Sequence, residues 1–305
     1  MEVLEVKEIS KSFAALKAVD NISFSIDKGT VFGLLGPNGA GKTTTIRMIM
    51  NIIIPDSGKV IIMGNTNAKA VKNLMGYLPE ERGIYRKMKV SEVLLFLSEL
   101  KSMSKQEAKK QIDLWLERLD LMEWKKKKIE ELSKGMQQKL QFIATIMHKP
   151  KLLILDEPFL GLDPINANLI KEIIMELKKE GVTIIFSTHI MDSAEKLCDE
   201  IMLINKGENI LSGKLSDIKN GYGKKNIHLE YDGKDNFLKN SDKIKKFDNF
   251  GNYVEIQLYK ESDPQDFLNE IVGSIAIKKF EIVEPSLNDI FIESVSNSRM
   301  GVENE

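Results

Sequence analysis

The stretch Gly36-Pro37-Asn38-Gly39-Ala40-Gly41-Lys42-Thr43-Thr44 decides the fold, because it fits the phosphate-binding pattern G-x-x-x-x-G-K-[ST]. Residues 31–35 before it are apolar and predict a short buried strand, and residues 44–50 after it have helical spacing. In that setting the loop turns its backbone N–H groups inward, toward the positive end of the helix. The pattern predicts a nucleoside triphosphate site, with Lys42 at the β- and γ-phosphates and Thr43 on Mg²⁺. A glycine-rich turn that binds nothing is the alternative, and it fits this setting less well.

Bulk properties describe an ordinary globular chain. The sequence has 305 residues, enough for two domains, with 42% hydrophobic and 29% charged residues. Its net charge of −1 argues against a generally basic nucleic-acid binder, so no nucleic-acid partner is expected. A single cysteine, Cys198, excludes an intramolecular disulfide and a zinc cluster built from cysteines.

Membrane and targeting signals are not evident in the sequence. Residues 1–5 lack the basic segment and the apolar run of a signal peptide. No apolar run approaches the roughly 18 residues that span a bilayer. If the protein works at a membrane, we therefore expect another chain to supply the membrane part.

The first half of the chain mixes strands and helices. Residues 1–30 alternate apolar and polar side chains, which predicts an antiparallel sheet. Residues 60–64 predict a further strand, and residues 77–83 a polar loop. A helical insert covers about residues 88–149 and interrupts the alternation of strands and helices. A lone aromatic residue, Phe13, could stack on an adenine base or simply fill the core.

A Gly- and Lys-rich break at residues 219–225 predicts the domain boundary, giving domains 1–218 and 219–305. The second domain shows a βαββαβ order, which is compatible with a ferredoxin-like unit. A last helix is predicted over residues 287–295.

Two acids follow a continuous apolar strand at residues 152–155, where a parallel sheet places its functional residues. Phosphate chemistry requires one carboxylate for Mg²⁺ and one group that orients a water. We assign Asp156 to the metal and Glu157 to the water, because consecutive strand residues point in opposite directions. Acids that simply meet solvent are the alternative, and the nearby glycine loop disfavours it.

Two further positions suit phosphate binding. His189 follows the buried strand at residues 182–186 and could donate a hydrogen bond to a γ-phosphate, although an isolated histidine is more often a core residue. Ser133 and Gly135 offer a hydroxyl and an unobstructed backbone at a helix N-terminus, which is an anion-binding device. Serine is also a common helix cap, so this signal alone is weak.

In this order, the segments resemble the nucleotide-binding domain of ABC transporters over residues 1 to about 215. The segments that carry the resemblance are Phe13, residues 36–44, Glu80, residues 132–137, residues 152–158, residues 161–164 and His189. The resemblance implies an α/β fold of the P-loop NTPase class, with a RecA-like core, an antiparallel β-subdomain, a helical subdomain and a small C-terminal α+β domain of ferredoxin-like order. It also implies that Phe13 stacks on adenine and that Asp163 lies at a dimer interface.

Further roles come from the same resemblance. Ser133, Gly135 and Gln137 would close on ATP bound by the opposite subunit, and His189 would sense the γ-phosphate. The family pattern Leu-Ser-Gly-Gly-Gln reads Leu-Ser-Lys-Gly-Met here, with Lys134 and Met136 as the departures. Glu80 stands where the family has a glutamine. A carboxylate there can still coordinate Mg²⁺, but it adds negative charge beside the triphosphate.

Residues 284–291, Glu-Pro-Ser-Leu-Asn-Asp-Ile-Phe, resemble the end of ATP-binding subunits of ABC-2-type exporters, including those of sodium efflux and drug export. The loop at residues 78–83 points the same way. The resemblance implies an ATPase that dimerises around two ATP–Mg²⁺ and drives separate membrane permease subunits from the cytoplasmic face of the membrane. A soluble ABC ATPase that drives a mechanical or regulatory partner is the alternative.

Overall fold

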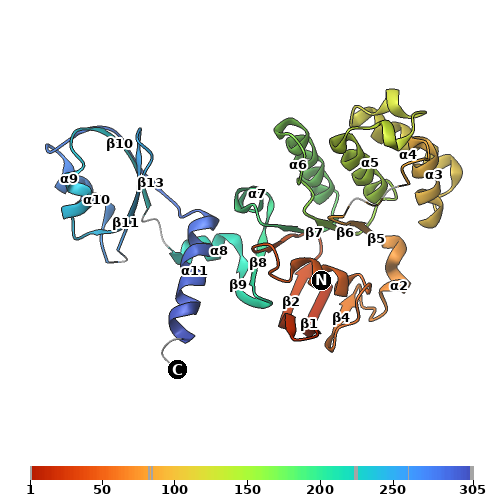
Figure 1. The fold of residues 1–305 in the computed structure, drawn as a ribbon, viewed down its shortest axis with the longest axis horizontal. Coiled ribbons are helices and arrows are strands. Elements are labelled where there is room, and N and C mark those ends of the chain that lie inside the picture. The colour runs from red at the N-terminus through yellow and green to blue at the C-terminus, as the bar shows by residue number, and fades with distance from the viewer. Residues whose placement is uncertain (1, 82, 84, 223–225, 260, 303–305) are drawn as a thin grey trace. The chain divides into compact units, whose positions relative to one another are not determined.

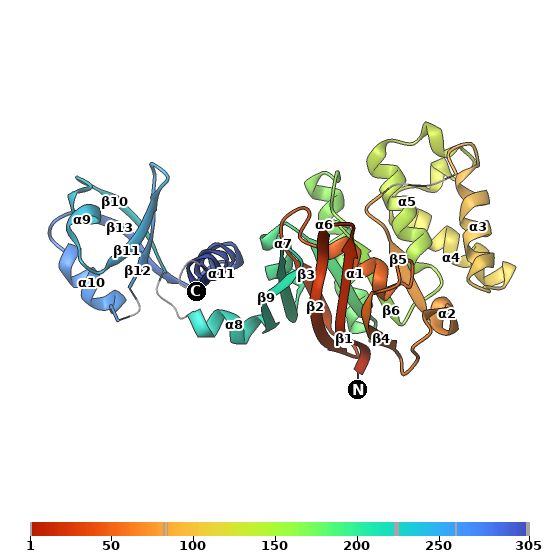
Figure 2. The same ribbon diagram turned by 60° about the horizontal axis from the view of Figure 1, so that its bottom comes forward.

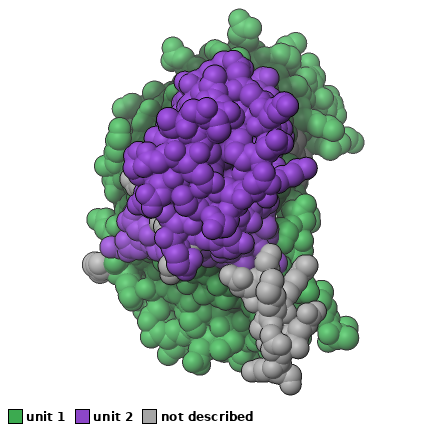
Figure 3. Space-filling view, turned by 90° about the vertical axis from the view of Figure 1, so that its left-hand side faces the viewer, with its two compact units in different colours: residues 1–213 green, residues 214–305 purple. Residues whose placement is uncertain are grey.

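The computed structural model describes residues 2–81, 83, 85–222, 226–259 and 261–302. It divides into two compact units, residues 1–213 and 214–305, which Figure 3 colours separately. Each unit has its own hydrophobic core and is described by itself. Within the described ranges, no helix is long and apolar enough to cross a bilayer.

A six-stranded sheet forms the centre of the first unit, in the order β5-β6-β7-β3-β8-β9 (Figure 1). Its strands are β5 (Met75–Leu78), β6 (Leu152–Asp156), β7 (Thr183–Thr188), β3 (Val31–Leu35), β8 (Glu200–Asn205) and β9 (Glu208–Lys214). The pairs from β5 to β8 are parallel, and every residue of β3, β6 and β7 is buried. The carboxyl ends of these three strands therefore meet at one edge of the sheet, directly before the predicted site residues.

A second, antiparallel sheet packs against this centre through helix α1 (Lys42–Ile49) (Figure 2). Its strands, in spatial order, are β2 (Leu16–Asp27), β1 (Glu2–Phe13) and β4 (Ser57–Ile62). One core joins α1 to both sheets, with members such as Leu4, Ile22, Ile46, Ile62 and Ile154. The antiparallel sheet predicted from the alternation of residues 1–30 is thus confirmed.

Helices complete the first unit. They are α2 (Ala68–Val71), α3 (Val90–Leu100), α4 (Lys105–Arg118), α5 (Lys134–Ile146), α6 (Pro164–Lys179) and α7 (Met191–Leu197), with short 3-10 turns η1 (Lys72–Leu74), η2 (Met122–Trp124) and η3 (Ile129–Glu131). Side-chain caps fix four of the starts, because the oxygens of Asn67, Ser104, Ser133 and Asp163 accept backbone N–H groups of α2, α4, α5 and α6. The insert formed by α3, α4 and α5 agrees with the predicted helical region.

Strand β5 and Cys198 are two further features of the first unit. Strand β5 occupies residues that the sequence assigns partly to a polar loop, because this four-residue edge strand gains its pairing only from β6. Cys198 packs so closely against the central strand β3 that a Cβ added to Gly33 would lie 2.5 Å from the Cys198 Sγ. Burial raises the pKa of this thiol.

The second unit contains a four-stranded antiparallel sheet in the order β11-β12-β10-β13. Its elements are α8 (Leu215–Tyr222), β10 (Asn226–Asp232), α9 (Asn236–Asn240), β11 (Ile244–Asn249), β12 (Val254–Leu258), α10 (Pro264–Ile271), β13 (Ala276–Val283) and α11 (Leu287–Val302). From β10 to β13 the chain follows the βαββαβ order, which agrees with the ferredoxin-like prediction. The predicted break is wrong at residues 219–222, which continue α8, and its residues 223–225 lie outside the described residues.

Candidate nucleotide-binding and hydrolysis site

The loop between β3 and α1 folds around the side chain of Lys42. The Lys42 Nζ donates to the carbonyl oxygens of Gly36 at 2.8 Å and Pro37 at 3.1 Å. Gly41 has a φ of +110°, and a Cβ added there would lie 2.5 Å from the carbonyl oxygen of Ala18. Only glycine fits this approach of two backbones, so the sequence pattern has a direct steric cause.

Lys42 is a buried cation in an acidic setting. Its side chain is 6% exposed, and its Nζ lies 3.9 Å from the Glu157 Oε1. Burial lowers the pKa of Lys42, while the nearby carboxylates of Glu157, Asp156 and Glu80 oppose this shift. A phosphate group would supply the compact negative charge that such a buried ammonium requires.

The predicted metal ligand Asp156 lies at the end of β6 and is 1% exposed. Its Oδ1 accepts hydrogen bonds from the Thr43 Oγ1 at 3.3 Å and from the Ser187 hydroxyl. Its Oδ2 is buried and has no hydrogen-bond partner among the described residues. Burial raises the pKa of this carboxyl, and hydrogen bonds from Ser187 and Thr43 oppose that shift.

These groups fit Mg²⁺ bound together with a phosphate. Within the described ranges no three His, Cys, Asp or Glu residues are placed to hold a metal ion together. Mg²⁺ commonly takes one or two protein oxygens and completes its octahedron with substrate phosphates and water. The unpartnered Asp156 Oδ2 and the neighbouring Thr43 hydroxyl suit that arrangement.

Glu157 has left the strand, since β6 ends at Asp156 and the φ of Glu157 is +49°. The predicted reason for two roles, strand alternation, is therefore wrong; the left-handed turn directs Glu157 to the end of β7 instead. Its Oε1 accepts from the backbone N–H of His189 at 3.1 Å and lies 2.8 Å from the His189 Nδ1. Because a carboxylate only accepts, we assign a proton to Nδ1. The Nε2 atom can then donate to a phosphate only as imidazolium.

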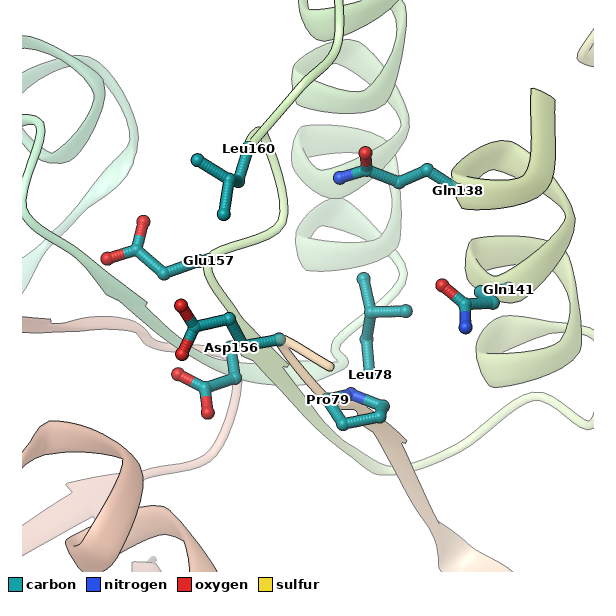
Figure 4. A pocket seen from close by; sticks show the side chains of 8 residues that line it. Leu78, Pro79, Gln138, Gln141, Asp156, Glu157 and Leu160 are labelled. Carbon is teal, nitrogen blue, oxygen red and sulfur yellow. The ribbon is translucent and has the colours of Figure 1, made fainter. Parts of the chain in front are cut away.

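Glu80 lines a pocket together with Asp156 and Glu157. Figure 4 shows this pocket. Its lining comes from three segments: Leu78, Pro79 and Glu80 after β5, Gln138 and Gln141 of α5, and Asp156, Glu157 and Leu160 after β6. Glu80 is exposed, whereas Asp156 and Glu157 are buried. The structure thus joins Glu80 to the two acids that the sequence singled out.

Phe13 and Asp163, two further predicted site residues, make their contacts away from this pocket. Phe13 is 46% exposed at the end of β1, with the Lys11 Nζ 5.8 Å from its ring centroid. Asp163 caps α6 through hydrogen bonds from the backbone N–H groups of Ile165 and Asn166. Both side chains lie at the surface, so both remain available to a ligand or a second subunit.

The segment at the start of α5 is partly committed to its own structure. The Ser133 Oγ accepts from the backbone N–H of Met136 at 3.2 Å, which leaves its hydroxyl hydrogen able to donate. Gly135 is half-buried in the first turn of the same helix. The Gln137 Nε2 donates to the carbonyl oxygens of Ile129 and Leu132, so its amide nitrogen fixes the preceding loop.

Hydroxyl groups at the end of β7 were missed as site residues. Ser187 donates to Asp156 and also accepts from the backbone N–H of Glu157 at 3.2 Å. The Thr188 Oγ1 lies 3.4 Å from the Glu157 Oε2. A Ser-Thr pair directly before a candidate histidine is a usable signal, because the carboxyl ends of adjacent parallel strands meet.

A glycine loop opening a helix, beside acids at the ends of parallel strands, defines a nucleoside triphosphate-binding protein. Family comparison agrees: residues 19–160 match the ABC transporter family, and residues 213–295 match the C-terminal domain of DrrA1-3-like ATP-binding proteins. The ABC transporter ATP-binding protein YhaQ of Bacillus subtilis is 45% identical, covering 96% of this chain and 98% of its own. The linearmycin resistance ATP-binding protein LnrL of the same species is 41% identical over 71% of this chain and 70% of its own.

A solved structure supports the same conclusion. The ATP-binding subunit of an ABC transporter matches with a TM-score of 0.68 and 32% identity, covering 72% of this chain and 93% of that one. The chain therefore belongs to the ABC transporter ATP-binding family and has its P-loop NTPase fold. It binds nucleotide and is an ATPase, as members of this family are.

Proposed function

We propose that this chain powers an ABC exporter, as two copies that enclose two ATP–Mg²⁺ and drive separate membrane permease subunits. The observation that carries the proposal is the contact between Glu157 and His189 beside Lys42. It combines a base, its orienting partner and a phosphate-binding cation in one place. The similarity to LnrL, named for linearmycin resistance, favours export of a drug.

Nucleotide binding would use the loop and its neighbours. Residues 36–44 would hold the phosphates through backbone N–H groups, and Lys42 would exchange its two loop carbonyls for phosphate oxygens. Phe13 would stack on the adenine with its exposed ring. Thr43 and Asp156, with Glu80 nearby, would hold Mg²⁺, which when bound neutralises charge on the transferred phosphoryl group.

Hydrolysis would follow from the two residues at the ends of β6 and β7. Glu157 would orient the attacking water through a carboxylate oxygen. His189 would hold Glu157 through its backbone N–H and Nδ1, and would donate from Nε2 toward the γ-phosphate as imidazolium. Ser187 and Thr188 would fix both carboxylates at the edge of the sheet.

The second subunit would complete each site. The free hydroxyl hydrogen of Ser133, the backbone at Gly135 and the positive end of α5 suit a phosphate bound by the other copy. Gln137 would act in the same segment, although its amide nitrogen is engaged with the preceding loop. Asp163 and the 82% exposed Ile165 would lie at the interface between the two copies.

The permease would meet the helical insert. Phe96 of α3, which is 37% exposed, contacts Tyr85 just before the insert, which is 56% exposed, edge to face with ring centroids 5.6 Å apart. Leu100 is also exposed on α3, so apolar groups are available for a membrane partner. The protein would thus act at the cytoplasmic face of the membrane, held there by its permease.

The variants Glu157→Gln and Lys42→Ala test this proposal. In the presence of ATP and Mg²⁺, E157Q should bind nucleotide, hydrolyse it at least about a hundredfold more slowly and elute as a dimer in size-exclusion chromatography. K42A should lose nucleotide binding and remain a monomer. Hydrolysis by E157Q at the wild-type rate would sink the assignment of Glu157. Copurification with a soluble partner, and not with a polytopic membrane protein, would favour the alternative of a non-transport ATPase.

A further inference from the structure

Strand β5 lies at the edge of the six-stranded sheet, so no described strand pairs with its outward carbonyls. Side chains of the helical insert take the place of a neighbouring strand. The Lys101 Nζ, at the end of α3, donates to the carbonyl oxygens of Lys72 and Met75, each at 2.7 Å. His148, just after α5, reaches the same Met75 oxygen with its Nε2 at 3.0 Å.

Helix α5 also packs tightly against β5. A Cβ added to Gly76 would lie 2.4 Å from the backbone oxygen of Thr145. The Thr145 hydroxyl binds its own helix at Gln141 and lies 3.4 Å from the carbonyl oxygen of Tyr77. The strand and the helix therefore have little room to move independently.

Both donors toward Met75, Lys101 and His148, are half-buried. A carbonyl oxygen only accepts, so the His148 Nε2 carries a proton, and its Nδ1 is buried without a partner among the described residues. Burial lowers the pKa of Lys101. A half-buried ammonium and a half-buried imidazole that converge on one carbonyl make a specific clamp between the insert and β5.

We infer that Lys101 and His148 are positioning residues that couple the helical insert to Glu80 through β5. The strand ends at Leu78, and the chain reaches Glu80 in the nucleotide pocket two residues later. A shift of α3 or α5 moves the clamped end of β5 and so displaces Glu80 from its place beside Asp156. The insert proposed to meet the permease would thereby adjust the metal end of the site.

This inference rests on the proposed role of Glu80 at Mg²⁺, and a double-mutant cycle separates the two. We would measure the Mg²⁺ concentration that half-saturates binding of a fluorescent ATP analogue in Lys101→Met, with and without Glu80→Gln. K101M should raise this concentration about threefold to tenfold in the wild-type background and less than about twofold in the E80Q background. Lys101→Arg should restore most of the loss, and Lys109→Met, at an exposed lysine of α4, should change nothing.

Three outcomes decide the matter. Equal effects of K101M in both backgrounds would overturn the coupling through Glu80 and leave the metal role of Glu80 intact. No effect of E80Q alone would overturn that metal role and the inference with it. If K101M does not fold by circular dichroism, the same cycle with His148→Ala decides, because His148 binds the same carbonyl.

Discussion

One oxygen of Glu157 is held by a single residue twice: its Oε1 lies 3.1 Å from the backbone nitrogen of His189 and 2.8 Å from the Nδ1 of the same histidine. The other oxygen faces Thr188 at 3.4 Å. The carboxylate is therefore fixed by the end of β7, and not by its own strand. We therefore expect the two residues to act as one unit in hydrolysis.

Replacing His189 by alanine should slow ATP hydrolysis about a hundredfold, because Glu157 loses its orienting partner and the γ-phosphate loses a donor. Nucleotide affinity should stay within about twofold, since Lys42 and the loop remain. Single-turnover hydrolysis and equilibrium binding measure the two effects. Adding H189A to E157Q should cost little more than E157Q alone, as expected for residues that act together. Independent, multiplicative losses would contradict the unit.

Replacing Glu80 by glutamine should change the dependence of nucleotide binding on metal. The substitution removes a negative charge from the pocket that also contains Asp156 and Glu157. Without metal, ATP should bind about tenfold more tightly to E80Q, because two charges about 10 Å apart repel by roughly 1.5 kcal/mol at an effective dielectric constant near 20. Calorimetric titration in excess chelator tests this. Unchanged affinity would show that Glu80 does not act on the phosphates.

Two glycines of the loop should respond differently to alanine. Gly39 has a φ of +79° and open space around an added Cβ, so Gly39→Ala should cost about 1–2 kcal/mol of unfolding free energy from backbone strain alone. Gly41→Ala adds a collision with the Ala18 carbonyl oxygen and should cost more. Urea unfolding of both variants measures the difference. Equal losses would show that the β2 backbone yields freely at this point.

His148 should make the protein less stable in acid. Burial lowers the pKa of its imidazole to about 4 in the folded chain, against 6.5 as the ordinary value. Between these pH values the unfolded chain takes up a proton that the folded chain does not. The contribution of neutral His148 to the unfolding free energy should thus be fully present above pH 6.5. It should be lost as the pH drops toward 4, by at most about 3 kcal/mol.

The matched variant for this prediction is His148→Gln, whose amide can still donate to Met75 but does not titrate. The difference in unfolding free energy between the wild type and H148Q should change over that pH range. Urea unfolding at pH 7.5, 5.5 and 4.5 measures it. A difference that is constant with pH would contradict the assignment.

The core of the fold could be predicted because its signals are local. The strand before the glycine loop, the helix after it and the apolar run before Asp156 each read directly from the sequence. Strand β5 could not, since four residues with a glycine and a following proline carry no periodicity, and its pairing comes from β6. Helix α8 was not predicted at all, because Gly221 and the nearby lysines suggest a break.

The site, like the fold, was predictable only where its signals are local in the sequence. Residue types next to strand ends made Asp156, Glu157 and His189 candidates, because parallel strands gather such residues at one edge. Which atoms meet could not be predicted. The left-handed turn at Glu157 and the convergence of Lys101 and His148 on one carbonyl arise from packing between segments distant in sequence.

The packing of Cys198 against β3 has a practical consequence for labelling. Its thiol lies against Gly33 in a half-buried residue, and burial raises its pKa, so thiol-directed probes should modify it more slowly than an exposed cysteine. It is also the sole cysteine of the sequence. One cysteine introduced on an exposed surface should then react before Cys198 with a fluorophore or spin label. A short labelling time would thus direct the probe to the introduced site in the native background.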